Sequence, residues 1–440
     1  MTSRDISQTR LFEQLTGDED SRLCKDISEA ACHEQPRNFF LHLAGALGNK
    51  LADEMSNARL VLPWLMGTIG APIWMVGLLV PIREAGALLP QMLVAGLMRS
   101  RPVRKWFWVI GGALQALAAL GLGVLALSGS GVLGGALVLM ALTLLAVARG
   151  ISSIATKDVL GKTIAKGRRG TLMGWSGSIA GAITLAVGGV LVLFDDRPGG
   201  LALAALMAVA ASGWAINALC AARISEEPGA VEGGDNAWRA MADGLQMMRS
   251  DSALVQFNLT RALLLSSALA LPYVALLGQR QNGDDLGGLG ILVVVSGLAG
   301  MLASPIWGKR SDTSSRRVMR DGGLGAAASC LLAAAISGWG LGGEHVIWLY
   351  ALVYALLVIA HAGIRLGRKT YIVDLAHSGN RALYVALSNT LTGGLMLLFG
   401  GMVGALAQWL SATALLVVLA AIALVAAGVA QRLPELESTI

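Results

Sequence analysis

The amino-acid sequence predicts an all-α integral membrane protein with twelve transmembrane helices in two bundles of six. Three observations support this fold class: the composition, a series of apolar blocks of membrane-spanning length, and one polar segment that divides them equally. The 440 residues are 55% hydrophobic and 14% charged, and the mean hydropathy is +0.64. Soluble domains are typically about 45–50% apolar and about 25% charged. The composition therefore excludes a soluble enzyme and a cytosolic nucleic-acid-binding protein.

The apolar blocks are each close to the roughly 20 residues that a helix needs to cross a hydrocarbon core of about 30 Å. Residues 223–254 are polar and predict a cytoplasmic linker between an N-terminal bundle over 59–222 and a C-terminal bundle over 255–431. Residues 432–440 predict a cytoplasmic tail. The predicted spans are 60–79, 81–99, 106–128, 132–153, 171–193, 201–222, 255–279, 286–307, 322–340, 346–366, 383–407 and 410–431.

Two segments precede the first predicted span. Residues 1–36 carry eight acidic and four basic side chains and predict an acidic cytoplasmic region. Over 37–58, apolar residues such as Phe39 and Leu43 recur at every fourth position, with Asn49, Lys50 and Asp53 on the other side. This pattern predicts an amphipathic helix that lies in the membrane interface. The alternative is a soluble amphipathic helix.

The basic residues predict the orientation of the chain. With both termini in the cytoplasm, thirty Lys and Arg residues fall on the inner side and three on the outer side, and Arg261 falls at the entrance of a span. Cytoplasmic loops of membrane proteins carry such an excess of basic residues. The count therefore predicts cytoplasmic termini.

The two predicted bundles contain an internal repeat. Loop residues that follow the second span recur 212 positions later, after the eighth span. A second match at an offset of 213 includes Gly150 with Gly363. Two six-helix bundles in parallel repeat are typical of one large class of transporters. The pairs at the first offset are Gly96 with Gly308, Arg104 with Arg316, and Lys105 with Arg317.

The second of these loops, G-x-x-x-D-x-x-x-R-R from Gly308 to Arg317, resembles the loop motif of the major facilitator superfamily. The resemblance covers residues 60–431 and implies a central cavity between the bundles, with alternating access by rocking. It also implies a gate in which Asp312 meets the positive end of a facing helix. Ser100 stands where the first loop should carry its acid, which predicts an asymmetric gate. The gate candidates are Gly96, Arg101, Arg104, Lys105, Gly308, Asp312, Arg316 and Arg317.

Glu84 is the acidic residue whose predicted depth points to a function. The 14 residues between Glu84 and Arg99 span about 21 Å as a helix, which is too short for a core of about 30 Å. We therefore expect Arg83 and Glu84 within the second span, in its outer half, with Gln91 on the face of Glu84. An ionisable group at membrane depth is a candidate for ion coupling. The alternative is a pair on a short turn at the membrane surface.

Further polar residues fall within the predicted spans. Arg149 lies near the inner end of the fourth span, where the alternative is an anchor that extends to the membrane surface. Arg261 opens the second half as Arg59 opens the first, and an interfacial anchor is the favoured interpretation there. A histidine such as His361 has an ordinary pKa that suits a proton relay, although a packed or hydrated residue is the favoured interpretation for a lone histidine near a helix end. Tyr273, Tyr354 and Asn389 are cavity-lining candidates or partners of neighbouring helices.

These features predict a permease that moves a small solute, with protons as candidate coupling ions, across the bacterial inner membrane by alternating access. Besides the solute, we expect contacts with membrane lipids. We expect a monomer that binds no cofactor, metal or nucleic acid. A nucleotide-binding loop around Lys162 is excluded because Thr156 occupies the position of its first glycine. No catalytic constellation appears. The alternatives are a transporter-fold sensor or assembly partner, suggested by the acidic N-terminal region, and a lipid flippase.

Overall fold

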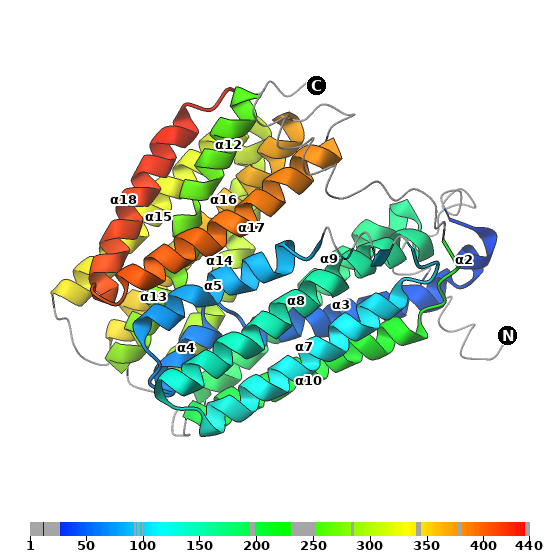
Figure 1. Ribbon diagram of the computed structural model, residues 1–440, viewed down its shortest axis with the longest axis horizontal. Coiled ribbons are helices and arrows are strands. Elements are labelled where there is room, and N and C mark those ends of the chain that lie inside the picture. Colours follow the sequence, from blue (N-terminus) through cyan, green and yellow to red (C-terminus); the bar gives the residue numbers. More distant parts are fainter. Residues whose placement is uncertain are drawn as a thin grey trace.

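The computed structural model is built from helices packed side by side (Figure 1). It describes residues 27–91, 100–193, 199–229, 251–282, 286–339, 345–375 and 381–435, together with residues 12, 94, 97 and 98. Within these residues there is no β-strand. Ten helical stretches among them are long and apolar enough to cross a membrane.

The helices form an N-terminal half and a C-terminal half. The N-terminal half contains α2 (Glu29–His33), α3 (Gln35–Met55), α4 (Val61–Thr68), α5 (Ile73–Leu88), α7 (Lys105–Ser128), α8 (Gly131–Thr163), α9 (Lys166–Leu193) and α10 (Gly199–Arg223). The C-terminal half contains α12 (Ser252–Leu263), α13 (Leu265–Asn282), α14 (Leu286–Thr313), α15 (Ser315–Gly338), α16 (Val346–Leu375), α17 (Arg381–Leu406) and α18 (Ala412–Gln431).

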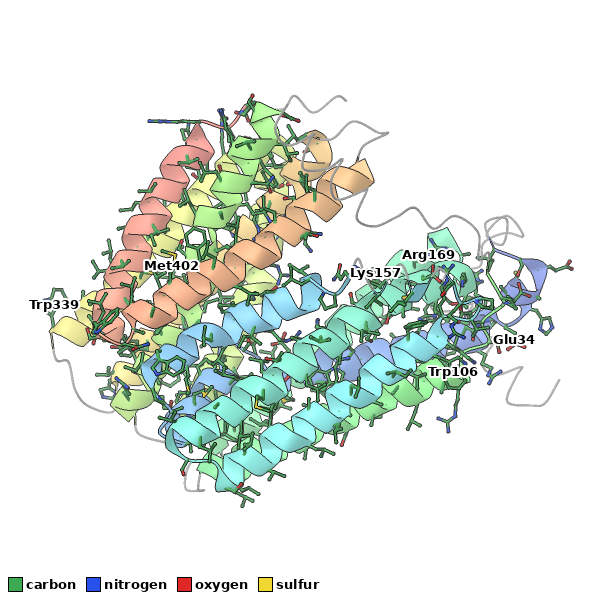
Figure 2. The ribbon with its side chains drawn as sticks, in the orientation of Figure 1. Glu34, Trp106, Lys157, Arg169, Trp339 and Met402 are labelled. Atoms are coloured by element: carbon green, nitrogen blue, oxygen red, sulfur yellow. The ribbon has the colours of Figure 1, made fainter. Side chains whose placement is uncertain are left out.

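Apolar side chains cover the outside of both halves. Met402 and Trp339, which are labelled in Figure 2, are 53% and 77% exposed, and Leu133 on α8 is 72% exposed. A soluble protein rarely exposes so many large apolar side chains on long helices. This surface therefore supports the prediction of a multi-pass membrane protein.

The two halves contact each other mainly through two antiparallel helix pairs. Helix α5 lies between α17 of the other half and α8 of its own (Figure 1). In the second pair, α9 packs on α14, where a Cβ on Gly290 would lie 2.7 Å from the backbone nitrogen of Val192. At the same end of the molecule, Gln279 Nε2 of α13 donates to the carbonyl oxygen of Trp64 at 3.0 Å. The halves are thus in close contact at the end that carries the turn at residues 69–72.

The amphipathic helix predicted over 37–58 is a member of the N-terminal bundle, so the prediction of a separate interfacial helix is wrong. Helix α3 packs along α10, and the two backbones approach closely where Gly48 meets Gly213. Phe39, on another face of α3, is fully buried in a cluster with Leu172 of α9. The polar side of this helix, which predicted contact with water or lipid headgroups, instead faces the interior of the protein.

The approach of α3 to α10 predicts a steric effect at Gly48. A Cβ on Gly48 would lie 2.5 Å from the carbonyl oxygen of Gly213, so we expect Gly48→Ala to destabilise the protein by about 1–3 kcal/mol, as overpacking does. The matched control is Gly121→Ala on α7, where no atom lies within 4 Å of the added methyl group. Unfolding in mixed micelles measures both. Equal stability of the two variants would contradict the close packing.

The first predicted span, 60–79, is also wrong, because a turn interrupts it. Helix α4 ends at Thr68 and α5 begins at Ile73. Between them Gly70 adopts φ +68°, a conformation that glycine reaches without steric cost. The turn was hidden because its neighbours are as apolar as the helices that it joins. Residues 230–250 of the predicted linker lie outside the described residues.

The first residues of the predicted linker are fixed on the N-terminal half. Glu226 accepts hydrogen bonds from the backbone N–H groups of Arg104 and Lys105 at the start of α7, at 3.0 and 2.6 Å. Its side chain is fully buried and also pairs with Lys162 at 2.8 Å. A carboxylate is favourable at the N-terminal end of a helix. Glu226 therefore supplies a buried carboxylate to the N-terminal end of α7.

Candidate functional site

A cavity of about 560 Å³ lies between the two halves. The N-terminal half contributes residues of α3, the α3–α4 junction and α9, and the C-terminal half contributes residues of α13, α14 and α16. Much of its wall is apolar or glycine, including Gly177 and Gly181 of α9. Its charged lining residues are Lys50, Asp53, Glu54, Arg59 and Arg365.

Two smaller cavities share part of this charged lining. One of about 290 Å³ is lined by Arg83, Glu84 and Arg149, and one of about 90 Å³ by Arg261, Arg368 and His361, among others. Arg59 and Arg365 line all three cavities. The three spaces therefore surround one group of ionisable side chains, which we call the charged centre.

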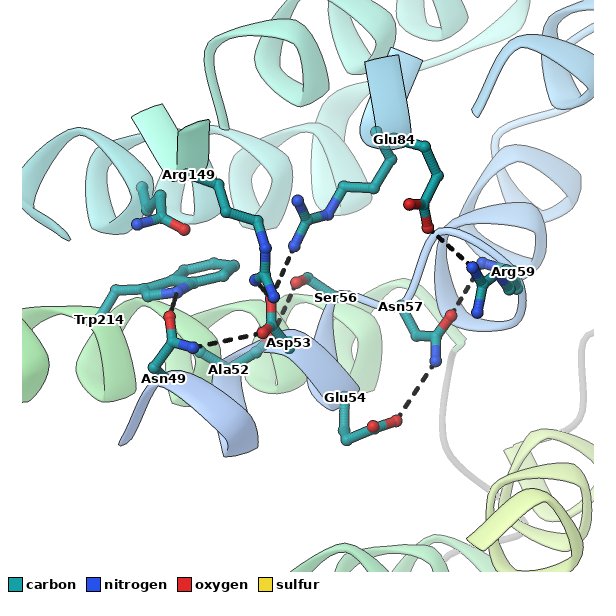
Figure 3. Close-up of polar contacts among 12 residues, drawn as sticks. Asn49, Ala52, Asp53, Glu54, Ser56, Asn57, Arg59, Glu84, Arg149 and Trp214 are labelled. Atoms are coloured by element: carbon teal, nitrogen blue, oxygen red, sulfur yellow. Dashed lines mark hydrogen bonds and ion pairs between the residues drawn. The ribbon is translucent and has the colours of Figure 1, made fainter. Parts of the chain in front are cut away.

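Asp53 joins three helices within the charged centre (Figure 3). Its Oδ1 accepts from Arg83 Nη2 of α5 at 2.7 Å and also from Arg149 Nη1 of α8. Asn49, one turn earlier on α3, donates to its Oδ2 at 3.4 Å. The Asp53 and Arg83 side chains are only 19% and 13% exposed. One carboxylate thus compensates two guanidinium groups that are largely removed from solvent.

Glu84 forms a second ion pair at the charged centre. Its Oε1 lies 2.7 Å from Arg59 Nη2, and its side chain remains 41% exposed to the cavities (Figure 3). Arg83 and Glu84 lie within α5, and Glu84 is about 16 Å along the helix axis from Ile73. They are therefore placed inside a helix, as the length argument predicted, and not on a terminal turn. The Nε2 atom of Gln91 donates to the Ala87 carbonyl oxygen, one turn earlier, at 2.8 Å.

Arg59 lies at the break between α3 and α4. The side chain of Asn57 accepts from the backbone N–H of Arg59 at 2.9 Å, a local bond that competes with helical pairing. The carbonyl oxygen of Arg59 accepts from Tyr354 OH of α16 at 3.2 Å. The break therefore places a charged side chain at the centre and joins the two halves through the backbone.

The candidates of the C-terminal half lie on α12, α13, α16 and α17. Arg261 donates to Ser388 Oγ at 2.8 Å and to Asn389 Oδ1 at 2.9 Å, so it contacts α17 and lines a cavity. His361 Nδ1 lies 3.0 Å from Ser267 Oγ. Tyr273 is fully buried and packs against Gly77 of α5. Arg261, Asn389 and His361 thus belong to the charged centre or contact it, whereas Tyr273 lies between helices.

Sequence reasoning missed six members of the charged centre. Lys50, Asp53 and Glu54 were assigned to an interfacial helix, and Arg59 to an anchor. Arg365 and Arg368 counted only as inner basic residues. A usable signal was present, because His361, Arg365 and Arg368 follow i, i+4, i+7 spacing and so share one face of α16.

The gate candidates join helices of the same half. Lys105 Nζ donates to the carbonyl oxygens of Ala222 and Ile224, at the end of α10. Arg316 likewise donates to the carbonyl oxygens of Gln431 and Leu433, at the end of α18. A basic side chain of each loop thus binds the end of the last helix of its own half, although the predicted offset of 212 pairs Lys105 with Arg317 and not with Arg316.

The other gate candidates have different surroundings. Arg104 Nη1 lies 2.6 Å from Asp158 Oδ1 on α8. Arg101 and Arg317 are exposed, and a Cβ on Gly308 would meet no atom within 4 Å. Gly96 and the side chain of Asp312 lie outside the described part of the chain.

The charged centre does not resemble a metal site. In the part of the chain that the structure describes, no three His, Cys, Asp or Glu side chains gather as metal ligands would. Its members are mostly arginines, which carry only donors and bind anions. Its chemistry is therefore ion pairing and hydrogen bonding.

Solved structures of transporters share this fold. A nucleoside transporter, NupG, aligns with a TM-score of 0.70 at 14% identity, over 90% of this chain and 99% of that one. A POT family transporter in complex with 5-aminolevulinic acid aligns with a TM-score of 0.66 at 14% identity, over 89% and 94%. The inward-open xylose transporter XylE from E. coli aligns with a TM-score of 0.65 at 11% identity, over 91% and 98%.

These identities establish likeness of fold. No family model matches the chain, and no curated protein matches it in sequence. The structural likeness nevertheless extends over nine-tenths of the chain and almost the whole of each transporter. The chain therefore has the fold of secondary transporters, in agreement with its resemblance to the major facilitator superfamily.

Proposed function

We propose that this protein is a secondary active transporter that moves a small solute across the cytoplasmic membrane by alternating access. The observation that carries the proposal is the charged centre, which lies in cavities between two halves of a transporter fold. Buried charges of this kind are expensive at membrane depth and mark solute or ion pathways. The charged lining of the cavities and the likeness to solved transporters thus both support a transport function.

The proposal includes twelve membrane passages in two bundles of six. Ten stretches meet the length and hydropathy of a span, and one of them joins α12 and α13 across a break. Helices α3 and α4, broken at Arg59, and helix α5 would supply the other two. Broken first passages in both halves suit a binding site, because interrupted helices leave polar groups near the middle of the membrane.

The place where the two halves meet indicates the side of the membrane to which the cavity opens. The halves meet at the end with the turn at residues 69–72, and Lys157 and Arg169 lie at the opposite end (Figure 2). If the basic end faces the cytoplasm, as the positive-inside rule suggests, the contact closes the outer side. Solute would then exchange with the cytoplasm in this conformation.

Counterflow in proteoliposomes tests the transport function. Vesicles that contain the purified protein are loaded with one unlabelled solute from a panel of sugars, nucleosides, dipeptides, carboxylates and phosphate esters, and the labelled solute is added outside. We expect transient accumulation of at least one labelled solute over protein-free vesicles. Absence of exchange for every class would contradict a transport function and favour a sensor or an assembly partner.

A further inference from the structure

The charged centre holds more positive than negative charge. Its described lining residues include seven bases and three acids, which leaves a surplus of four positive charges. The acids cannot compensate this surplus, because Asp53 is shared by Arg83 and Arg149 and Glu84 pairs with Arg59. The bases are Lys50, Arg59, Arg83, Arg149, Arg261, Arg365 and Arg368, and the acids are Asp53, Glu54 and Glu84.

The uncompensated charge is concentrated on the C-terminal half. Arg365 and Arg368 form no hydrogen bond or ion pair with any described residue, and Arg261 bonds only to the neutral side chains of Ser388 and Asn389. Each of the three lines the cavity of about 90 Å³. Three guanidinium groups therefore converge on one space, and no described acid forms an ion pair with them. Glu84 also lines this space, but it pairs with Arg59.

The same space contains buried polar nitrogen atoms without hydrogen-bond partners. Among the described residues, the Nε atoms of Arg261 and Arg368 and the Nε2 atom of His361 are buried and make no hydrogen bond. His361 is only 7% exposed, and it lines both this cavity and the cavity of about 560 Å³. An unsatisfied buried polar group is costly, and an unpaired buried charge more so. The arrangement is therefore incomplete without an acceptor.

We propose, on the basis of the transport function proposed above, that the solute is a small organic anion whose carboxylate or phosphate group binds Arg261, Arg365 and Arg368. Guanidinium groups match both oxyanions, since their planar donors bind two oxygens at once. The carbon body of the anion extends into the cavity of about 560 Å³, a volume typical of small-molecule sites. Glycine and apolar residues line that space beside Gly177 and Gly297.

The test compares solutes that differ in charge but share a carbon skeleton. Succinate is paired with succinamide, and glucose 6-phosphate with glucose, at constant ionic strength. The melting temperature of the detergent-solubilised protein reports binding, because a ligand that binds the folded state raises it by mass action. We expect at least one anion to raise the melting temperature while its neutral partner does not. Stabilisation by no anion, or equally by the neutral partner, would overturn the proposal.

Substitutions test whether the anion binds at the assigned arginines. Arg365→Gln with Arg368→Gln should weaken binding of that anion by about tenfold to 100-fold per arginine, as expected for charge-assisted bonds. Its ligand-free melting temperature should not fall, since both removed charges are unpaired. The control is Arg432→Gln, an exposed arginine after α18. An undiminished shift in the double variant would contradict the assigned site.

Two further arms distinguish a solute site from a lipid site, and binding from transport. Short-chain phosphatidylglycerol replaces the solutes in one arm; stabilisation by this lipid alone would show a lipid-headgroup site and overturn the proposal of a solute. In the other, the stabilising anion is tested in counterflow. Binding without exchange would refute transport while leaving the anion site intact. If the double variant exchanged a neutral solute at the wild-type rate, the proposal of an anionic solute would be refuted, whereas the proposed transport function would stand.

Discussion

Asp53→Asn is expected to destabilise the protein by about 3–5 kcal/mol, the usual cost of breaking a buried ion pair. The carboxylate of Asp53 is the only described acid in contact with Arg83 and Arg149. Asparagine retains the size of the side chain but leaves two guanidinium groups uncompensated between α3, α5 and α8. We therefore expect both a loss of stability and a loss of transport.

The matched control for this variant is Glu54→Gln. Glu54 is the next residue on α3 and lines the same cavity, but it contacts Asn57 and no described base. Reversible unfolding in mixed micelles gives the free energy of unfolding of each variant. Additional replacement of Arg149 by glutamine should recover part of the stability, because one unpaired charge is then removed. An Asp53→Asn variant as stable as Glu54→Gln would show that the network contributes little.

Glu84→Gln is expected to abolish proton-driven accumulation while leaving counterflow intact. Glu84 holds Arg59 at the break between α3 and α4, and the Arg59 carbonyl oxygen is bonded to Tyr354 of the other half. Protonation of Glu84 would release Arg59 and change this connection. Glutamine cannot change its charge, so the solute would equilibrate without responding to the proton gradient.

Proteoliposomes with an imposed pH difference measure the effect of Glu84→Gln. For one proton per solute, a difference of one pH unit drives about tenfold accumulation, equivalent to about 1.4 kcal/mol. We expect this accumulation in the wild type and none in the variant. Glu54→Gln serves again as the control. Identical responses of Glu84→Gln and wild type would refute coupling through Glu84, and loss of response only in Glu54→Gln would assign it to Glu54.

The fold class was predictable because membrane helices must be long and apolar. Hydropathy was misleading at α3, because this helix of the N-terminal bundle carries a polar stripe of Asn49, Lys50 and Asp53. Such a stripe also arises when a membrane helix faces an internal cavity, and hydropathy alone does not distinguish this from a surface helix. The sequence does not reveal that Gly48 and Gly213 bring α3 and α10 into contact.

The charged centre was only partly predictable for a related reason. Glu84 was found because a helix that begins after it would be too short to cross a membrane. Asp53 and Arg59 precede the first predicted span, and Arg365 falls at the inner end of the span predicted over 346–366, so all three were assigned to the membrane surface. Their depth depends on where α3, α4 and α16 begin and end, and caps such as the Asn57 side chain decide this locally.

Distances between the halves, measured at both ends of the molecule, test alternating access most directly. Spin labels at Ser130→Cys and Trp409→Cys report the end with the turn at residues 69–72, and labels at Lys157→Cys and Thr313→Cys report the opposite end. All four positions are exposed. Across acidic and alkaline pH, with and without succinate or glucose 6-phosphate, we predict that one distance lengthens as the other shortens. Two distances that stay constant, or that change in the same direction, would contradict alternating access.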